Sequence, residues 1–419
     1  MKTVGVIMEC NPFHNGHSYF LKKAKEISGA QYCVAVISGD YVQRGEPACF
    51  SKELRTKALL QNGADLVLEL PVAFSTGSAE YFARAGLALL DKLGCIDTLC
   101  FGSEYGQIDL FQKAARLLTD TTMTATDSPY QQLLSKLLKD GKSYPAARYE
   151  ALVTLSDCQE ILPLLEKPNN ILGLEYCQAL LLQNSNIKPI TFCREGAGYH
   201  DLTNNAVFAS ASGIRKAMVE TPENIAFLGH IPDNCHSLYQ DALSSNQFIT
   251  GNEFSLLLAK QILFSNTEKL ATYQDVTADL AQKLCSLGTK CNTFTSYCDA
   301  LKSKNYTYTR ISRALLHIIL EITKESVENQ VAMDYVSYAR ILGFCKDSSE
   351  LLSHMKECTC IPLISKLADA PKILSPESFM QLQQTLSASH LYNVLLAQKT
   401  GCDMMHESSK KIIIHESTP

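Results

Sequence analysis

The first hundred or so residues alternate short apolar runs with stretches in which apolar residues recur at helical spacing. The apolar runs predict β-strands over residues 4–8, 33–37, 66–70 and 98–101. The helical spacing predicts α-helices over residues 19–27, 53–61 and 80–93. Ser51 is placed to cap the second helix and Gly94 to end the third. Strands that alternate with helices form a parallel sheet, so the sequence predicts an α/β fold.

The chain beyond this region is mainly helical by the same criteria. Residues 109–165 and 171–182 have helical patterns, and Pro189 introduces a short strand, residues 190–193, that we return to the sheet. Strand signals then fade after about residue 221, and helices are expected over residues 252–263, 277–286, 309–322 and 391–397. The tail, residues 410–419, looks loosely attached. We therefore expect a Rossmann-like domain over residues 1–220 and a helical region over residues 221–419.

The composition is that of a soluble globular protein. Hydrophobic residues make up 46% of the 419 residues and charged residues 19%. No run of about eighteen uncharged apolar residues is present, so we expect no membrane span. The start of the sequence lacks the apolar segment and small-residue cleavage site of a signal peptide, and we expect a cytoplasmic protein.

Cysteine content and net charge bear on three questions: whether the chain has disulfides, a metal site or an overall attraction to nucleic acid. The 16 cysteines are scattered with no Cys-x-x-Cys pair, which favours free, buried thiols over a disulfide framework. A zinc site from Cys358, Cys360 and a distant histidine matches no usual ligand spacing, so we expect no metal site. The net charge of −5 gives no overall attraction to nucleic acid, and any RNA must be bound by a local basic patch.

The segment after the first predicted strand carries the clearest chemical signal. The strand breaks at Pro12 and leads directly into a His-x-Gly-His motif, residues 14–17. Gly16 leaves room for a ribose or base, and the first helical turn offers unpaired N–H groups to phosphate. His14 and His17 share one face of that turn and can donate hydrogen bonds to an α-phosphate under attack. This arrangement indicates adenylyl transfer from ATP.

A solvated loop with two surface histidines is the alternative interpretation. The position of the motif after the first strand favours the nucleotide site, because open α/β sheets bind ligands at the carboxyl ends of their strands. The loop after the second strand, residues 38–48, reaches the same edge. Its polar side chains Asp40, Gln43 and Arg44 can shape a pocket for the acceptor, although a plain connecting loop explains them equally well.

Two later segments add to the predicted nucleotide site. Gly102 follows the fourth strand and lets the backbone lie close to adenine, although a plain turn also accounts for it. Ser210, Ser212 and Arg215 stand at a predicted helix start, where hydroxyls, N–H groups and a guanidinium can bind pyrophosphate. A serine cap on an ordinary helix is the alternative.

Residues 302–313 are the densest basic segment of this acidic chain. Cations and tyrosines alternate within it: Lys302, Lys304, Tyr306, Tyr308, Arg310 and Arg313. Cations suit RNA phosphates and tyrosines stack on unpaired bases, so the segment is a candidate RNA-binding surface. A solvated helix start is the alternative.

Taken together, these motifs resemble those of the bacterial tRNA(Met) cytidine acetate ligases. The resemblance runs in order over most of the chain and is weaker after about residue 350; it rests on residues 9–17, 38–45, 168–173, 194–200 and 302–313. It implies a nucleotidyltransferase domain with a His-x-Gly-His motif, followed by a helical tRNA-binding region. It also implies an ATP-dependent, AMP-forming ligase that makes acetyl-adenylate from acetate and acetylates N4 of the wobble cytidine in elongator tRNA(Met), releasing pyrophosphate.

The resemblance also implies which residues contact ATP. The main part of the ATP site carries over onto one continuous stretch: Ile7, Met8, Glu9, Cys10, Asn11, Pro12, Phe13, His14, Asn15, Gly16, His17, Ser18, Tyr19 and Phe20. Gly102, Asn169 and Arg194 are implied as further ATP contacts. Cys10 departs from the tyrosine that we expect in this family.

In this interpretation acetate attacks the α-phosphorus while His14 and His17 stabilise the transition state and Arg215 holds the departing pyrophosphate. The cytidine amine then attacks the mixed anhydride. Mg²⁺ is compatible with such a site, and no separate signature for an acetyl-coenzyme A enzyme is present. Two alternatives stay open: a small-molecule adenylyl- or cytidylyltransferase of the same superfamily, and a non-catalytic tRNA-binding factor with ATP as a structural ligand.

Overall fold

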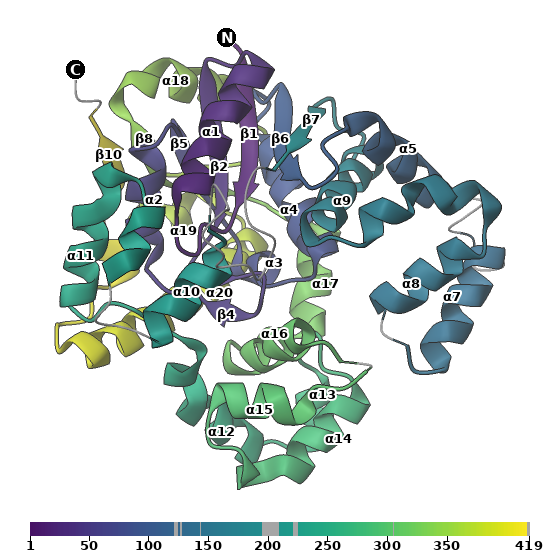
Figure 1. The fold of residues 1–419 in the computed structure, drawn as a ribbon. Coiled ribbons are helices and arrows are strands. Elements are labelled where there is room, and N and C mark those ends of the chain that lie inside the picture. The colour runs from purple at the N-terminus through teal and green to yellow at the C-terminus, as the bar shows by residue number, and fades with distance from the viewer. Residues whose placement is uncertain are drawn as a thin grey trace.

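The computed structural model describes residues 1–120, 125, 128–142, 144–194, 209–220, 225–304 and 306–416. Its centre is a mostly parallel sheet with helices on both faces (Figure 1). Across the sheet the strands follow the order β10 (Ile413–His415), β8 (Ala339–Cys345), β5 (Leu66–Leu70), β2 (Tyr32–Ser38), β1 (Thr3–Met8), β6 (Thr98–Ser103) and β7 (Lys188–Cys193), and β9 (Leu363–Ile364) pairs with β8. A separate hairpin consists of β3 (Tyr41–Val42) and β4 (Glu46–Pro47).

The strands and helices predicted for the N-terminal region are confirmed. β1 pairs in parallel with β2 and β6, β2 with β5, and β6 with β7. The helices between these strands are α1 (Asn15–Ser28), α2 (Lys52–Leu60), α3 (Val72–Ser75) and α4 (Ala79–Lys92). Ser51 caps α2 by accepting a hydrogen bond from the backbone N–H of Leu54. Every predicted strand of this region therefore lies in one sheet, and the carboxyl ends of those strands share one edge.

The connection from β6 to β7 is helical, as predicted. Its helices are α5 (Ile108–Thr119), α7 (Pro129–Lys139), α8 (Tyr144–Val153) and α9 (Pro168–Leu182). α9 packs against both α4 and α5, whereas α7 and α8 project away from the sheet (Figure 1).

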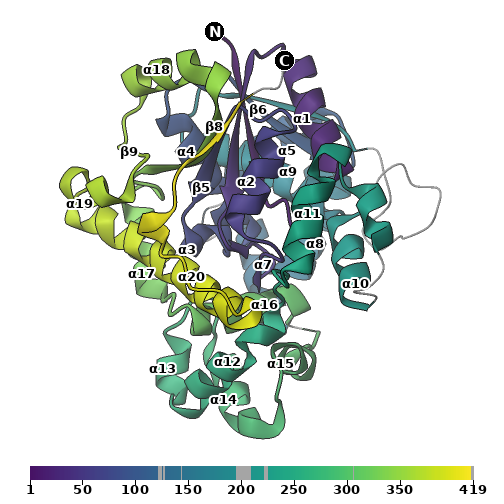
Figure 2. The same cartoon turned by 90° about the vertical axis from the view of Figure 1, so that its left-hand side faces the viewer.

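The chain after β7 forms most of the remaining helices. They are α10 (Ala211–Glu220), α11 (His236–Ser244), α12 (Ser255–Leu263), α13 (Thr267–Ala271), α14 (Ala278–Leu287), α15 (Phe294–Leu301), α16 (Tyr308–Ile319), α17 (Lys324–Ala332), α18 (Ser349–Cys358), α19 (Ala370–Ile373) and α20 (Pro376–Thr400). α12 to α16 form a lobe below the sheet in Figure 1, and the long α20 lies beside α3 (Figure 2).

Three strands after residue 221 correct our expectation that strand signals fade there. β8 enters the sheet antiparallel to β5, and β9 and β10 both pair with β8. The sequence of β8, a short apolar run with one arginine, is too short for periodicity to separate a strand from a buried helical turn. The sheet thus takes strands from both sides of residue 220, and the division into domains at that point stays a prediction.

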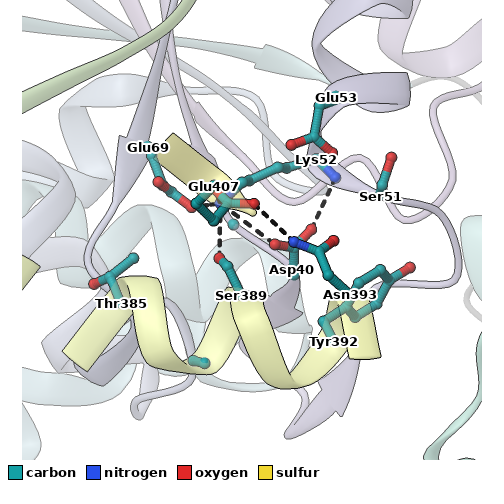
Figure 3. Close-up of polar contacts among 12 residues, drawn as sticks. Asp40, Ser51, Lys52, Glu53, Glu69, Thr385, Ser389, Tyr392, Asn393 and Glu407 are labelled. Carbon is teal, nitrogen blue, oxygen red and sulfur yellow. Dashed lines mark hydrogen bonds and ion pairs between the residues drawn. The ribbon is translucent and has the colours of Figure 1, made fainter. Parts of the chain in front are cut away.

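The C-terminal tail is anchored, which also differs from our expectation. The β10 strand adds to the sheet beside β8, and the preceding Glu407 is almost fully buried. Lys52 lies 2.8 Å from the Glu407 carboxylate and 2.9 Å from that of Glu69 (Figure 3). Burial raises the pKa of Glu407, but the attraction of Lys52 and Arg340 outweighs burial and lowers that pKa well below its ordinary value. The carboxylate therefore stays ionised and holds the tail in place.

Candidate active site

The His-x-Gly-His motif lies where β1 ends and α1 begins, at the carboxyl edge of the sheet. His14 is the N-cap of α1, and its Nδ1 accepts a hydrogen bond from the backbone N–H of Gly16 at 3.0 Å. His17 Nδ1 accepts in turn from the backbone N–H of His14 at 3.3 Å. The two imidazoles therefore cap the helix together, and their ring centroids lie 3.9 Å apart.

These contacts assign the tautomer of both rings. A neutral imidazole that accepts at Nδ1 carries its hydrogen on Nε2, so each ring presents an Nε2–H donor. Within the described residues neither Nε2 has a hydrogen-bond partner. Burial lowers the pKa of His14 to about 3, with Arg194 and His230 adding to the shift, and burial also lowers the pKa of His17 well below 6.5. Both rings are thus neutral hydrogen-bond donors near pH 7.

A titration by nuclear magnetic resonance is expected to show His14 as the neutral Nε2–H tautomer from pH 8 down to pH 5. A folded-state pKa near 3 lies below the unfolded value of 6.5, so the unfolded chain binds the proton first. The contribution of this ring to stability is therefore complete above pH 6.5 and is lost as pH falls toward 3. Long-range ¹⁵N–¹H spectra measure the tautomer directly; a midpoint near 6.5 would contradict the assignment.

The turn before the motif is held by a buried arginine that the sequence analysis missed. Arg55 of α2 is fully buried and donates to the carbonyl oxygens of Glu9 and Ser38 at 2.9 Å each and of Phe50 at 3.1 Å. It also donates to the carbonyl of Gly39. One guanidinium thus ties the carboxyl ends of β1 and β2 together. The signal in the sequence was a cation among the buried positions of α2.

The second predicted segment, around Arg215, reaches the same turn. Arg215 donates from Nη1 to the carbonyl oxygen of Asn11 at 2.6 Å, and its Nη2 lies 3.9 Å from Glu46. Ser210 caps α10 by accepting from the backbone N–H of Gly213 at 3.1 Å, and its hydroxyl lies 3.2 Å from that of Ser212. The start of α10 therefore lies beside the His-x-Gly-His turn, although about two hundred residues separate them in sequence.

The other predicted ATP contacts gather at the ends of β6 and β7. A Cβ on Gly102 would lie 3.0 Å from Arg194 Cγ and 3.7 Å from the Phe20 ring, so the stem of Arg194 crosses Gly102. Asn169 donates from Nδ2 to Glu104 at 2.7 Å, and this carboxylate also accepts from the backbone N–H groups at the start of α9. Residues 195–200, quoted with Arg194 in the sequence analysis, lie outside the described residues.

The structure separates the three side chains that we assigned to the acceptor pocket. The backbone N–H of Gln43 donates to Glu9 Oε1 at 2.7 Å, beside the histidine turn. Burial lowers the pKa of the neighbouring Arg44, and the nearby Glu9 opposes that shift. Asp40 instead points into the buried ion cluster, where it accepts from the backbone N–H of Lys52 at 3.0 Å (Figure 3). Gln43 and Arg44 thus lie near the motif, whereas Asp40 is bonded to the start of α2 and lies away from the motif.

The residues of the basic segment likewise differ in their exposure to solvent and in their partners. Lys302 and Lys304 are exposed. Tyr306 is buried, and the cations of Arg310 and Lys283 lie 5.1 and 5.2 Å from its ring centroid, so little of this ring is exposed for stacking on a base. In the same segment, Arg313 pairs with Asp275 at 2.9 Å, and Tyr308 is half-buried at the start of α16.

Sequence and structure comparisons define the class of the protein. The model of the HIGH Nucleotidyl Transferase family matches residues 1–407, and the chain belongs to that family. The chain is 34% identical over 420 residues to the tRNA(Met) cytidine acetate ligase of Acetivibrio thermocellus, covering 99% of this chain and 100% of that protein. Identity to the tRNA(Met) cytidine acetate ligase of Clostridium tetani is 36%, over 88% of this chain and 91% of that protein.

Solved structures agree with this assignment. The crystal structure of apo Thermotoga maritima TmcAL superposes with a TM-score of 0.91 at 29% identity and full coverage of both chains. The structure of the same protein bound with alpha-thio ATP gives a TM-score of 0.89 at 30% identity, again with full coverage. The chain is therefore a member of the tRNA(Met) cytidine acetate ligase family, an ATP-dependent ligase of the nucleotidyltransferase type. Among the described helices, none has the length and apolar character needed to span a bilayer.

Proposed function

We propose that this enzyme joins ATP and acetate to acetyl-adenylate and then acetylates N4 of the wobble cytidine of elongator tRNA(Met), in the cytoplasm. The observation that carries the proposal is the pair of neutral histidines at the start of α1, whose Nε2–H groups have no partner in the described part of the chain. Relatives named tRNA(Met) cytidine acetate ligase at 34–36% identity support the substrate assignment.

The proposed first step is an in-line displacement at the α-phosphorus of ATP. A carboxylate oxygen of acetate forms the new bond to phosphorus, the bond to the β-phosphate oxygen breaks, and pyrophosphate leaves with that electron pair. His14 and His17 donate hydrogen bonds to the α-phosphate oxygens as negative charge builds up on them. Arg215, at the start of α10, binds the departing pyrophosphate together with the hydroxyl of Ser212 and helix N–H groups.

The proposed second step transfers the acetyl group. The exocyclic amine of the cytidine attacks the acyl carbon, the bond from that carbon to the phosphate oxygen breaks, and AMP leaves while the amine loses a proton. Any Mg²⁺ would be held chiefly by the phosphates of ATP, since the described residues contain no group of three or more metal-ligating side chains. Gln43 and Arg44 lie beside the motif and are proposed to bind acetate.

Acetate-dependent exchange of labelled pyrophosphate into ATP tests the first step. Mass spectrometry of tRNA(Met) nucleosides after incubation with ATP and labelled acetate tests the second, with N4-acetylcytidine as the expected product. Exchange that depends on another acid or on a phosphate ester would favour the small-molecule transferase instead, and absence of exchange would favour the non-catalytic factor.

Replacement of Arg194 or Asn169 by alanine is expected to weaken ATP binding by about tenfold and to change turnover less. The loss of one hydrogen bond to a charged group has this scale, and contacts made equally in the ground and transition states raise KM without lowering kcat. Calorimetric titration with ATP and exchange kinetics measure the two quantities. Unchanged ATP affinity in both variants would remove these residues from the ATP site.

A further inference from the structure

The hairpin of β3 and β4 has its tip enclosed between the histidine turn and α16. Ser312 of α16 is fully buried and donates from its hydroxyl to the carbonyl oxygen of Gly45 at 2.8 Å. This bond joins two segments that lie 267 positions apart in sequence. It also joins the β3–β4 hairpin to α16, which carries the C-terminal half of the basic segment.

The backbone of the hairpin packs directly on the backbone of α16. Gly45 has a φ of +78°, and a Cβ there would lie 2.2 Å from the backbone nitrogen of Arg313 and 2.5 Å from its Cα. No side chain fits in that space, and L residues rarely adopt this φ. The contact therefore requires glycine, and any displacement of α16 moves the hairpin with it.

The other side of the same tip contacts the nucleotide site. The backbone N–H of Gln43 donates to Glu9 at 2.7 Å, and Glu46 lies 3.9 Å from the Arg215 guanidinium. Arg44 lies between these two anchors. The tip is therefore fixed on one side by residues of the proposed ATP site and on the other by Ser312.

From this geometry we infer that Ser312 is a positioning residue for the acetate pocket. Its hydroxyl fixes Gly45, and Gly45 fixes the adjacent Arg44 and Gln43 against Glu9. Ser312 touches no reacting atom and acts through the hairpin. The inference rests on the proposed function, since it takes Gln43 and Arg44 as the groups that bind acetate.

The test compares exchange kinetics of the full-length enzyme with the variants Ser312→Ala, Ser312→Thr and Gly45→Ala. Ser312→Ala is expected to raise KM for acetate by about five- to tenfold, the scale of one lost hydrogen bond, with KM for ATP within about twofold. Gly45→Ala places a Cβ against the backbone of α16 and displaces the hairpin tip, so it is also expected to raise KM for acetate and to leave KM for ATP nearly unchanged. Ser312→Thr keeps a hydroxyl and is expected to restore KM for acetate.

Ser296→Ala is the matched control. Ser296 lies in α15, and among the residues that the structure describes its hydroxyl bonds only to Thr293 at the same helix start, accepting from the N–H and donating to the carbonyl. Its loss is expected to lower the unfolding midpoint about as much as Ser312→Ala while leaving both KM values unchanged. An unchanged KM for acetate in Ser312→Ala, or equal increases of both KM values, would overturn the inference. Absence of acetate-dependent exchange in the wild-type enzyme would instead overturn the proposed function.

Discussion

Replacement of His14 by asparagine is expected to leave α1 intact and to slow acetate-dependent pyrophosphate exchange by about a hundredfold or more, the scale for one donor lost from a developing oxyanion. Asparagine is a favoured N-cap, and its Oδ1 takes the place of the Nδ1 that accepts from Gly16. Its side chain ends short of the Nε2 position, so only the outer donor is lost. His14→Ala and His17→Ala are expected to slow exchange to the same extent.

Thermal unfolding and calorimetric ATP binding separate a lost donor from a lost fold. The His14→Asn variant is expected to unfold at nearly the wild-type temperature, because the cap of α1 is kept. His354→Ala is the control, since this exposed histidine lies on α18 at the opposite edge of the sheet (Figure 1). Exchange at the wild-type rate in His14→Asn would remove this histidine from the mechanism.

Reversing the charges of the basic segment is expected to abolish tRNA binding and N4-acetylation while acetate-dependent pyrophosphate exchange continues. The full change replaces Lys302, Lys304, Arg310 and Arg313 with glutamate. The structure favours a smaller variant, because a glutamate at position 313 would face the carboxylate of Asp275 and strain the neighbouring hairpin. Lys302→Glu with Lys304→Glu changes exposed side chains only. This double variant is expected to weaken tRNA binding about a hundredfold through lost phosphate contacts.

Filter binding at several salt concentrations measures this effect. The salt dependence is expected to become shallower by about one counterion for each lost phosphate contact. Lys366→Glu with Lys372→Glu is the matched control, since it makes the same charge change on exposed residues outside the basic segment. Equal tRNA affinity in the two double variants would leave the basic segment as a solvated helix start and place the RNA surface elsewhere.

The sites proposed for the two activities are connected more directly in the structure than their separation in the sequence suggests. The histidine motif and the basic segment are almost three hundred residues apart in the chain, yet the hairpin tip at Gly45 touches both the turn before the motif and α16. The charge-reversal and Ser312 variants therefore separate an effect of the segment before α16 from an effect of α16 itself. One measures delivery of tRNA by exposed cations, and the other measures placement of the acetate pocket by a buried hydroxyl.

Local pattern determined the order of strands and helices in the N-terminal region and the place of the histidine motif. Strand and helix periodicities repeat within ten or so residues, and a motif directly after a first strand must lie at the carboxyl edge of a parallel sheet. The ordered motifs also determined the family. These features depend on residues that are near one another in sequence.

Tertiary structure alone decided which polar side chains reach the site. Asp40, Gln43 and Arg44 are all polar residues of one predicted loop. In the structure Asp40 contacts Lys52 in the ion cluster, while the other two lie beside Glu9. The burial of Tyr306, the entry of β8 into the sheet and the anchoring of Glu407 likewise depend on contacts between distant segments. Such contacts form because buried charges require partners and buried apolar surfaces require cover, and no local spacing specifies which distant residue supplies either.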